Sequence, residues 1–368
     1  MKIMMITAAD SIHAVRWANA FAQRGHEVVF VTLPDHREKS DSFSEKVTIH
    51  YLPFGGTKGY FFNALYLRKI YKSIKPDAVN VHYASGYGLL TRLARIEHTV
   101  LSVWGSDVYD FPQRSLLHKL IVKKNILYAN RIASTSTIMA ERVRRLINDP
   151  DYDIAITPFG VDTAKFNPVG NEALSKSFFW FGLVKKLTYK YGIDYVINAF
   201  SDFYSSWKAE GERGREPHLF ICGKGENKAE FERLVDEKGL KDVVIIEGYI
   251  PNNMIPAYLR SIDVFCLGSQ LDSESFGVSA VEAMACGVPI IATDVDGFKE
   301  VVVNEETGYI VDRKNSKEMT EKMHMLYYDR SLREILGQNG RDRVISLYEW
   351  SKNVNSLLRV IEEVSSNE

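Results

Sequence analysis

The chain has 368 residues, of which 45% are hydrophobic and 25% charged, with a formal net charge of −1. This length allows two ordinary domains, and the composition excludes a disordered or low-complexity protein. No apolar run reaches the length of a membrane span, and the apolar N-terminal stretch ends too soon for a secretory signal, so a cytoplasmic location is expected. Nucleic acid is not expected as a partner, because the chain is not basic overall.

The charges are unevenly distributed along the chain. Residues 1–165 hold 22 Lys and Arg against 15 Asp and Glu, whereas the remainder holds 24 against 32. Segments 46–76 and 111–140 contain no acidic residue and combine Lys and Arg with aromatic or aliphatic side chains. One interpretation is a pair of sheet-covering helices with solvated outer faces. The other is a surface that docks on anionic membrane near a lipid-linked acceptor.

The first half alternates short apolar strands with amphipathic helices. A helix is expected over 13–25, where Gly25 ends it, and further helical segments separate the later strands. This alternation is typical of a parallel, doubly wound α/β sheet. The strands are expected at 2–7, 27–33, 77–83, 98–104 and 131–136.

The alternation of strands and helices is interrupted over 158–168, "PFGVDTAKFNP", and a second series of strands then begins. The simplest account is two similar domains, 1–165 and 166–349, with a last helix over 350–368 that packs back on the first domain. Ligands of such sheets bind beyond the carboxyl ends of the strands, so the site is expected in a cleft between the domains. The second series of strands is expected at 177–184, 218–223, 242–250, 262–269, 288–295 and 307–312.

The three cysteines, Cys222, Cys266 and Cys286, are far apart and have no His at ligand spacing. Two lie in apolar strand-like runs and one in a helix beside Ala and Met. Buried, unreactive thiols are therefore expected in place of a metal or redox site.

The most informative stretch follows the strand that ends at Ser269. It carries Glu274, a Ser-Phe-Gly turn and a helix that contains Glu282. A glycine turn at a helix start presents unpaired N–H groups and the positive end of the macrodipole, which suits a phosphate. Carboxylates accept hydrogen bonds from sugar hydroxyls. The pattern therefore indicates a nucleotide-sugar, and the alternative is a solvated loop glutamate with an ordinary helical acid.

The stretch resembles the E-x7-E signature of the retaining glycosyltransferases of family 4, which have the two-domain GT-B fold. Further matches in the family's order are "RWANAFAQRGHEV", "ITPFGVDTAKFNP", "HLFICGKGE" and "TGYIV". The resemblance implies that Glu274 contacts the donor sugar and that Glu282 binds the ribose. It also implies that loop amides hold the sugar and diphosphate, that a glycine pair lets the nucleotide approach, and that backbone groups meet the base. These positions are Ser275, Phe276, Gly277 and Val278 for the loop, Gly223 and Gly225 for the pair, and Tyr249 and Ile250 for the base.

A departing diphosphate needs a positive charge beside it. The family usually has Arg and Lys five residues apart after the first strand of the second domain. This chain has Lys185 and Lys190 at that spacing, with Lys186 as a rival for the first role, and a basic surface loop is the alternative. Neither "DPDYD" nor "TDVDG" predicts a metal site, so no metal or other cofactor is expected.

The first domain is expected to hold the acceptor. The family often has His-Gly after the fourth strand, where this chain has Trp104 followed by Gly105. Another residue must then take the role of that His, and a structural role is the alternative for each histidine. The acceptor-side candidates are His13, Arg16, His82 and Asp107.

These observations together predict a retaining glycosyltransferase. It would move a sugar from a UDP- or GDP-sugar to a glycan or lipid-linked acceptor in cell-surface polysaccharide or glycolipid synthesis, in the cytoplasm or at the inner face of the membrane. A nucleotide-sugar epimerase or hydrolase of the same fold and a non-catalytic nucleotide-sugar-binding protein remain alternatives. A NAD-dependent dehydrogenase is disfavoured, because no G-x-G-x-x-G follows the first strand.

Overall fold

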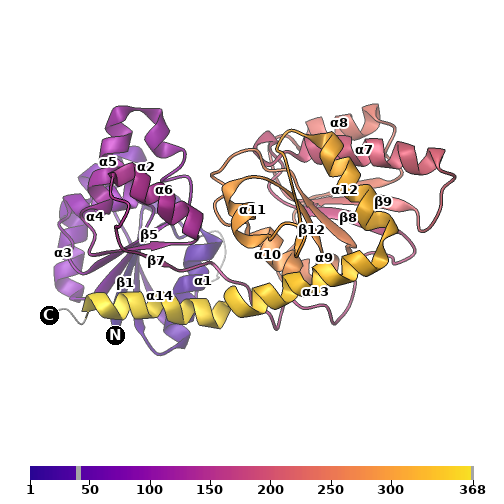
Figure 1. Ribbon diagram of the computed structural model, residues 1–368. Helices are drawn as coiled ribbons and strands as arrows, with labels where there is room; N and C mark the ends of the chain where they lie inside the picture. The colour runs from indigo at the N-terminus through magenta and orange to yellow at the C-terminus, as the bar shows by residue number, and fades with distance from the viewer. Residues whose placement is uncertain (39–42, 366–368) are drawn as a thin grey trace. The chain divides into compact units, whose positions relative to one another are not determined.

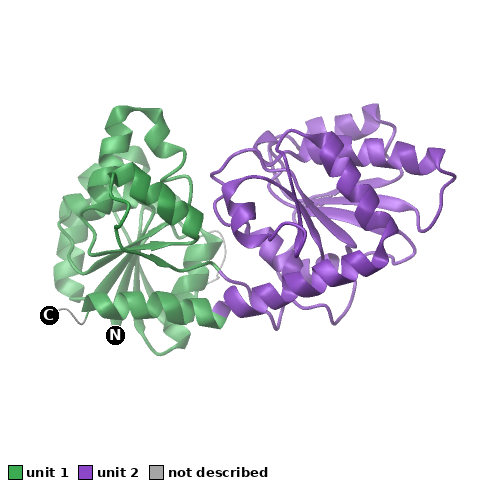
Figure 2. Ribbon diagram, in the orientation of Figure 1, with its two compact units in different colours: residues 1–159, 351–368 green, residues 160–350 purple. Residues whose placement is uncertain are grey.

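The computed structural model describes residues 1–38 and 43–365 of the chain. These form two compact units: unit 1 comprises residues 1–159 with the C-terminal segment from 351, and unit 2 comprises 160–350 (Figure 2). Each unit contains a parallel β-sheet covered by helices, as the alternation of strands and helices predicts. The assignment of acceptor and donor binding to separate domains stays a prediction.

The sheet of unit 1 has seven parallel strands within the described residues, in the order β3-β2-β1-β4-β5-β6-β7. All five expected strands are present, and β3 and β7 were not predicted. Both are edge strands of the sheet, and neither is a continuous buried run, so their sequences lack the apolar signal of the others. The strands are β1 (Lys2–Ile6), β2 (Glu27–Thr32), β3 (Val47–Tyr51), β4 (Ala78–His82), β5 (Thr99–Val103), β6 (Arg131–Ser134) and β7 (Ile154–Ile156).

Several helices of unit 1 bury apolar side chains against this sheet. Leu67, Leu90 and Met139 come from three different helices and have no exposed surface, which places the core between the helices and the strands. The 3-10 turns are η1 (Pro34–His36) and η2 (Phe111–Arg114). The helices are α1 (Ile12–Gln23), α2 (Gly56–Phe62), α3 (Ala64–Ile74), α4 (Gly86–Leu93), α5 (Leu116–Ile126), α6 (Thr137–Ile147) and the C-terminal α14 (Trp350–Ser365).

Helix α14 lies along unit 1, where its yellow ribbon runs beside α1 and β1 (Figure 1). The guanidinium of Arg24 donates to the side chains of Asn355, at 3.0 Å, and Ser351, at 2.9 Å. Arg131 and Glu363 form an ion pair at 3.2 Å. These contacts and the buried face of α14 join the end of the chain to the first sheet.

The sheet of unit 2 has six parallel strands among the described residues, in the order β10-β9-β8-β11-β12-β13. Every strand expected in this half is present. The strands are β8 (Phe179–Val184), β9 (Pro217–Cys222), β10 (Val244–Glu247), β11 (Val264–Leu267), β12 (Ile290–Thr293) and β13 (Gly308–Val311). The helices are η3 (Tyr189–Tyr191), α7 (Ile193–Ala209), α8 (Lys228–Glu237), α9 (Ile255–Ser261), α10 (Val278–Ala285), α11 (Asp296–Val301), α12 (Ser316–Tyr328) and α13 (Arg330–Leu347).

The three cysteines are buried and unpaired, as the sequence predicts. Burial raises the pKa of the Cys222 thiol to about 11 and that of Cys286 to about 12, so both stay protonated at neutral pH. None of the helices in the described part of the chain is long and apolar enough to cross a membrane.

Candidate active site

The carboxyl ends of the strands in unit 2 form the candidate site. All six strands are parallel, so the loops that follow them lie at one edge of the sheet. The strand order reverses between β8 and β11, and an ion pair joins the loops after these two strands. Lys185 Nζ lies 2.6 Å from Glu274 Oε2, and the two side chains are only 13% and 11% exposed. The sequence selected both residues but not their contact.

The loop that carries Glu274 is held against the start of α11. The Glu274 N–H donates to the Leu271 carbonyl at 3.0 Å, and the Glu274 carbonyl accepts from the Gly297 N–H at 2.9 Å. Gly277 is the N-cap of α10 and has a positive φ of 82°. A Cβ at Gly277 would lie 2.8 Å from the ring of Phe298, so backbone conformation and space both require glycine. The loop thus ends at a helix N-terminus, whose first N–H groups have no partner within the helix.

Four buried polar atoms in this stretch have no hydrogen-bond partner among the described residues. Buried polar groups are nearly always hydrogen-bonded, and such a cluster in one short segment is unusual. A ligand that carries hydroxyls or phosphates would supply the missing partners. These positions were not predicted from the sequence, although the polar pair that follows Gly268 at the end of the buried β11 was a usable signal. The atoms are Ser269 Oγ, Gln270 Oε1, Ser273 Oγ and Ser279 Oγ.

Arg313, which follows β13, connects the neighbouring loops and was also missed. Its Nε donates to Asp294 Oδ1 at 2.8 Å, and one of its terminal nitrogens donates to Asp272 Oδ1 at 2.9 Å. Burial alone would raise the pKa of Asp294, but the hydrogen bonds and charge of Arg313 outweigh it and hold the pKa below its ordinary value. The loops after β11, β12 and β13 are therefore tied through one guanidinium.

The first aspartate of the "TDVDG" segment, Asp294, is therefore bound to a cation of the protein itself. Within residues 1–38 and 43–365, no three His, Cys, Asp or Glu side chains come together in a group that could hold a metal.

The three lysines after β8 have different surroundings. Lys186 is exposed and pairs with Glu226 at 3.6 Å, with both side chains more than half exposed. Lys190 lies in η3, where its carbonyl accepts from the Gln270 N–H at 2.9 Å and its amine lies 5.7 Å from the ring centre of Tyr191. Lys185 is the one that contacts Glu274. The geometry thus favours Lys185 over Lys186 as the first of the two cations expected beside the diphosphate. The sequence alone did not distinguish these two lysines.

The glycine pair after β9 has a structural reason of its own. A side chain at Gly223 would collide with the carbonyl oxygen of Lys185, and one at Gly225 with that of Leu187. These glycines let the loops after β8 and β9 lie close together, whether or not a nucleotide is bound.

The positions expected near the base lie after β10. Tyr249 is 62% exposed and has Lys224 Nζ 4.6 Å from its ring centre, whereas Ile250 is buried. Glu282 is partly buried in α10, four residues after Val278, the first residue of that helix.

In unit 1, two acceptor-side candidates have buried side chains. Asp107 accepts at one oxygen from the Ala84 N–H, at 2.7 Å, and at the other from the N–H groups of Trp104 and Gly105. His82 has no exposed surface and lies 2.7 Å from Asn80 Oδ1. Burial, and then the nearby His13, lower the pKa of His82 to about 3, so it is neutral. Neither side chain reaches the surface in this structure, and the assignment of both residues to the acceptor side stays a prediction.

The remaining candidates of unit 1 lie beside an aromatic cluster. The His13 ring is 4.4 Å from that of Phe159 and 6.2 Å from that of Trp104, between ring centres, and Arg16 follows one turn later in α1. Three polar atoms at the carboxyl ends of the strands are buried without a hydrogen-bond partner in the described part of the chain. They are Thr7 Oγ1 after β1, His82 Nδ1 at the end of β4 and Thr135 Oγ1 after β6.

Comparison with known proteins decides the family. A family model described as "Glycosyl transferases group 1" matches residues 171–343, and one described as "Glycosyl transferase 4-like" matches residues 2–136. Both models describe glycosyltransferases, and between them they match most of the chain, which is therefore a glycosyltransferase. The first model spans β8 to β13, and hence all of the loops described above for unit 2.

The glycosyltransferase has relatives of similar length. It is 28% identical to an uncharacterized glycosyltransferase of Methanocaldococcus jannaschii over 343 residues, and this match covers 88% of each chain. It is 24% identical, over 92% of each chain, to the N,N'-diacetylbacillosaminyl-diphospho-undecaprenol alpha-1,3-N-acetylgalactosaminyltransferase of Campylobacter jejuni. The crystal structure of Anabaena HepE in complex with UDP matches 99% of this chain and 100% of its own, with a TM-score of 0.77 at 13% identity. The fold of the glycosyltransferase is thus GT-B, as predicted.

Proposed function

We propose that the glycosyltransferase takes a sugar from a UDP- or GDP-sugar and attaches it, with retention of anomeric configuration, to a glycan or lipid-linked acceptor. The observation that carries this proposal is the Lys185–Glu274 pair at the point where the strand order of unit 2 reverses. It places a cation and a carboxylate beside a helix N-terminus and beside four polar atoms that lack partners. A diphosphate flanked by sugar hydroxyls has the complementary chemistry.

In this proposal the donor replaces the ion pair. Lys185 leaves Glu274 and neutralises the diphosphate, while Glu274 accepts hydrogen bonds from the hydroxyls of the transferred sugar. The N–H groups at the start of α10 bind the same diphosphate, because the positive end of a helix favours an anion. Lys190 is the second cation, and Glu282 binds the ribose. Tyr249, Ile250 and the glycines at 223 and 225 border the nucleotide.

The transfer step needs no cofactor in this scheme. The oxygen of the acceptor hydroxyl bonds to the anomeric carbon, the bond from that carbon to the diphosphate breaks, and the hydroxyl proton passes to a diphosphate oxygen. The diphosphate departs from the same face of the sugar that the acceptor oxygen attacks, so the anomeric configuration is retained. Lys185 and the α10 N–H groups stabilise the charge that develops on the leaving group. Glu274 is not required as a nucleophile, which agrees with its close pairing to a lysine.

The carboxyl edge of the unit 1 sheet is proposed to bind the acceptor. His13 and Arg16 supply polar and charged groups beside the aromatic cluster. Asp107 and His82 act as positioning residues in this proposal. Asp107 accepts hydrogen bonds from the backbone of the Trp104 loop, and the His82 ring packs against the ring of Trp104. The Campylobacter relative, whose name includes a diphospho-undecaprenol, supports a lipid-linked acceptor. With such an acceptor the enzyme would act at the inner face of the membrane.

Thermal unfolding with a panel of UDP-, GDP- and ADP-sugars tests donor binding. A ligand at 100 times its dissociation constant stabilises the folded state by about 2.7 kcal/mol. NMR of the transferred product then gives the anomeric configuration, and an inverted linkage would refute the proposed step. Conversion of the donor at full rate without any acceptor would favour an epimerase or hydrolase. Binding with no turnover of any donor would favour a sensor of nucleotide-sugars.

A further inference from the structure

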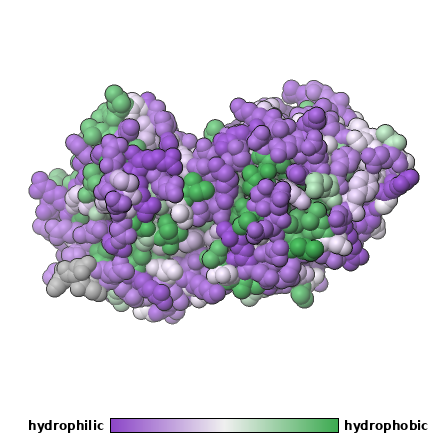
Figure 3. Space-filling view, in the orientation of Figure 1, coloured by the Kyte–Doolittle hydropathy of each residue, from purple (hydrophilic) through white to green (hydrophobic). Residues whose placement is uncertain are grey.

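Helix α5 of unit 1 exposes apolar side chains in addition to those that it buries. Val122 and Ile126 are fully buried against the sheet, which accounts for one face. The first turns of the helix nevertheless expose Leu116, Leu117 and Leu120, which are 86%, 64% and 46% accessible. Adjacent exposed leucines at the start of a helix are not explained by the core of unit 1, and such clusters mark interaction surfaces. Hydrophobic atoms gather at the end of unit 1 where α5 and α2 lie (Figures 1 and 3).

A cationic cavity adjoins this apolar turn. Its volume is about 240 Å³, and its lining residues come from η2, α5 and α6. Three of them are the cations Lys119, Arg142 and Arg145, and none is acidic. Lys119 lies in α5 between Leu117 and Leu120, so the apolar turn and the cavity share one helix. A phosphate-sized anion fits both the volume and the charge.

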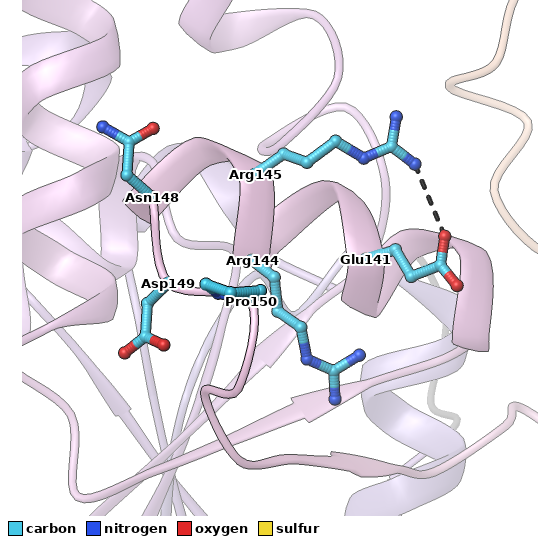
Figure 4. A pocket seen from close by; sticks show the side chains of 6 residues that line it. All are labelled: Glu141, Arg144, Arg145, Asn148, Asp149 and Pro150. Atoms are coloured by element: carbon cyan, nitrogen blue, oxygen red, sulfur yellow. Dashed lines mark hydrogen bonds and ion pairs between the residues drawn. The ribbon is translucent and has the colours of Figure 1, made fainter.

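The neighbouring depression shows what makes this cavity different. A hollow of about 510 Å³ at the C-terminal end of α6 is lined by Glu141, Arg144, Arg145, Asn148, Asp149 and Pro150 (Figure 4). It contains two acids, and its Arg144 donates to the Tyr152 carbonyl at 3.0 Å, which holds the chain beyond the helix. Arg145 extends along α6 to Glu141, at 3.4 Å, in an exposed pair that a stronger anion can displace. Arg145 thus borders both hollows, and only the smaller one is purely cationic.

Helices α2 and α3 carry a second surface of the same kind. Lys58, Phe61, Phe62, Leu65 and Lys69 are all exposed and follow helical spacing, with Leu65 at 80%. Both α2 and α5 pack against α4, so the two surfaces flank one helix. The segments that contain them, 46–76 and 111–140, have no acidic residue. Exposed apolar side chains bordered by lysines are the pattern of a helix that lies at a bilayer interface.

We propose that unit 1 docks on a membrane of anionic phospholipid, with a lipid phosphate in the cavity of Lys119, Arg142 and Arg145 and with the leucines of α5 among the acyl chains. The docking surface depends on neither the donor nor the reaction, and it extends the lipid-linked acceptor of the proposed function to named residues. Not every lysine of the acid-free segment 111–140 belongs to this surface. Lys123 donates to the Ile147 carbonyl at 2.7 Å, so its amine serves the end of α6 and is not part of the surface.

Sedimentation with vesicles tests the proposal. The full chain is mixed with vesicles of phosphatidylglycerol and phosphatidylcholine in equal parts, and with pure phosphatidylcholine, at low and high salt. Binding is expected to the anionic vesicles at low salt and to weaken at high salt. The double variant Arg142→Gln/Arg145→Gln should bind at least about tenfold more weakly, since the attraction per basic residue is large near an anionic surface. Leu116→Ser/Leu117→Ser should also lose binding while keeping the salt dependence.

Matched controls come from unit 2. Lys238→Gln removes an exposed charge and Val169→Ser removes a side chain that is 79% exposed, and both should sediment like the parent. Unchanged UDP-dependent thermal shifts in every variant would show that the donor site and the fold are intact. Equal binding by all variants, no binding to anionic vesicles, or equal binding to pure phosphatidylcholine would overturn the proposal. So would a dimer in solution that Leu116→Ser/Leu117→Ser dissociates, because a second copy would then cover the leucines.

Discussion

Replacing Lys185 by Met removes the cation from a carboxylate that has almost no access to water. Glu274 is 11% exposed and its partner 13%, with 2.6 Å between the charged atoms. A hydrogen bond to a charged group contributes about 1.5–3 kcal/mol, and the poor exposure of this pair leaves little room for solvent screening. In a unit of this size each 1 kcal/mol shifts the melting temperature by about 2–4 °C. The expected loss for unit 2 is therefore about 3–12 °C.

Calorimetry of the ligand-free protein measures this shift, and two further variants show its origin. The double variant Lys185→Met/Glu274→Gln removes the orphaned charge as well and should recover more than half of the loss. Lys186→Met is the matched control, because its pair with Glu226 is exposed and contributes about 0–1 kcal/mol. Turnover should fall about a hundredfold in Lys185→Met, on the scale of one lost transition-state stabiliser, and stay near normal in Lys186→Met. Equal effects of the two single variants would refute the pairing of Lys185 with Glu274 as the centre of the site.

Three other outcomes are expected. Glu282→Ala should raise the dissociation constant of UDP by about 10- to 150-fold in calorimetric titration, because it loses one charged hydrogen bond to the nucleotide. Glu274→Ala should still bind UDP and mainly lose turnover. The reverse pattern would show that the two glutamates have exchanged roles. The pKa of Asp294 lies below its ordinary 3.8, so its bonds to Arg313 stabilise the fold above about pH 4 and lose that effect as pH falls through the folded-state pKa. Denaturation followed from pH 6 to 2.5 should thus show a smaller acid loss for Arg313→Met than for the parent, and identical profiles would argue against the link. With pKa values raised by burial, the three thiols should not react with a disulfide reagent at pH 8 until the chain is denatured, and fast labelling of the native protein would contradict their burial.

Much of the fold follows from local pattern. Apolar runs of strand length alternate with helical spacing, and the buried strands of both sheets appear where those runs predict them. Gly277 also follows from local pattern, because glycine is the residue that most readily adopts the left-handed backbone conformation found just before this helix. The burial of Cys222, Cys266 and Cys286 also follows from their apolar neighbours. These features depend on residues within a few positions of one another, so the sequence alone carries them.

The chemistry of the site depended on contacts that no local pattern contains. Lys185 and Lys186 are adjacent in sequence, and only the parallel pairing of β8 with β11 brings the first of them to Glu274, which is 89 positions away. Arg313 gathers three loops because three parallel strands end side by side, a neighbourhood created by strand order.

Burial decided the remaining cases. The sequence does not decide the exposure of His82 or Leu116. The histidine at a strand end has no exposed surface, and the leucine at the start of a helix is 86% exposed. Whether a given face of a helix or strand end meets protein or water is set by what packs over it. That information lies in the assembled units and not in the spacing of residues along the chain.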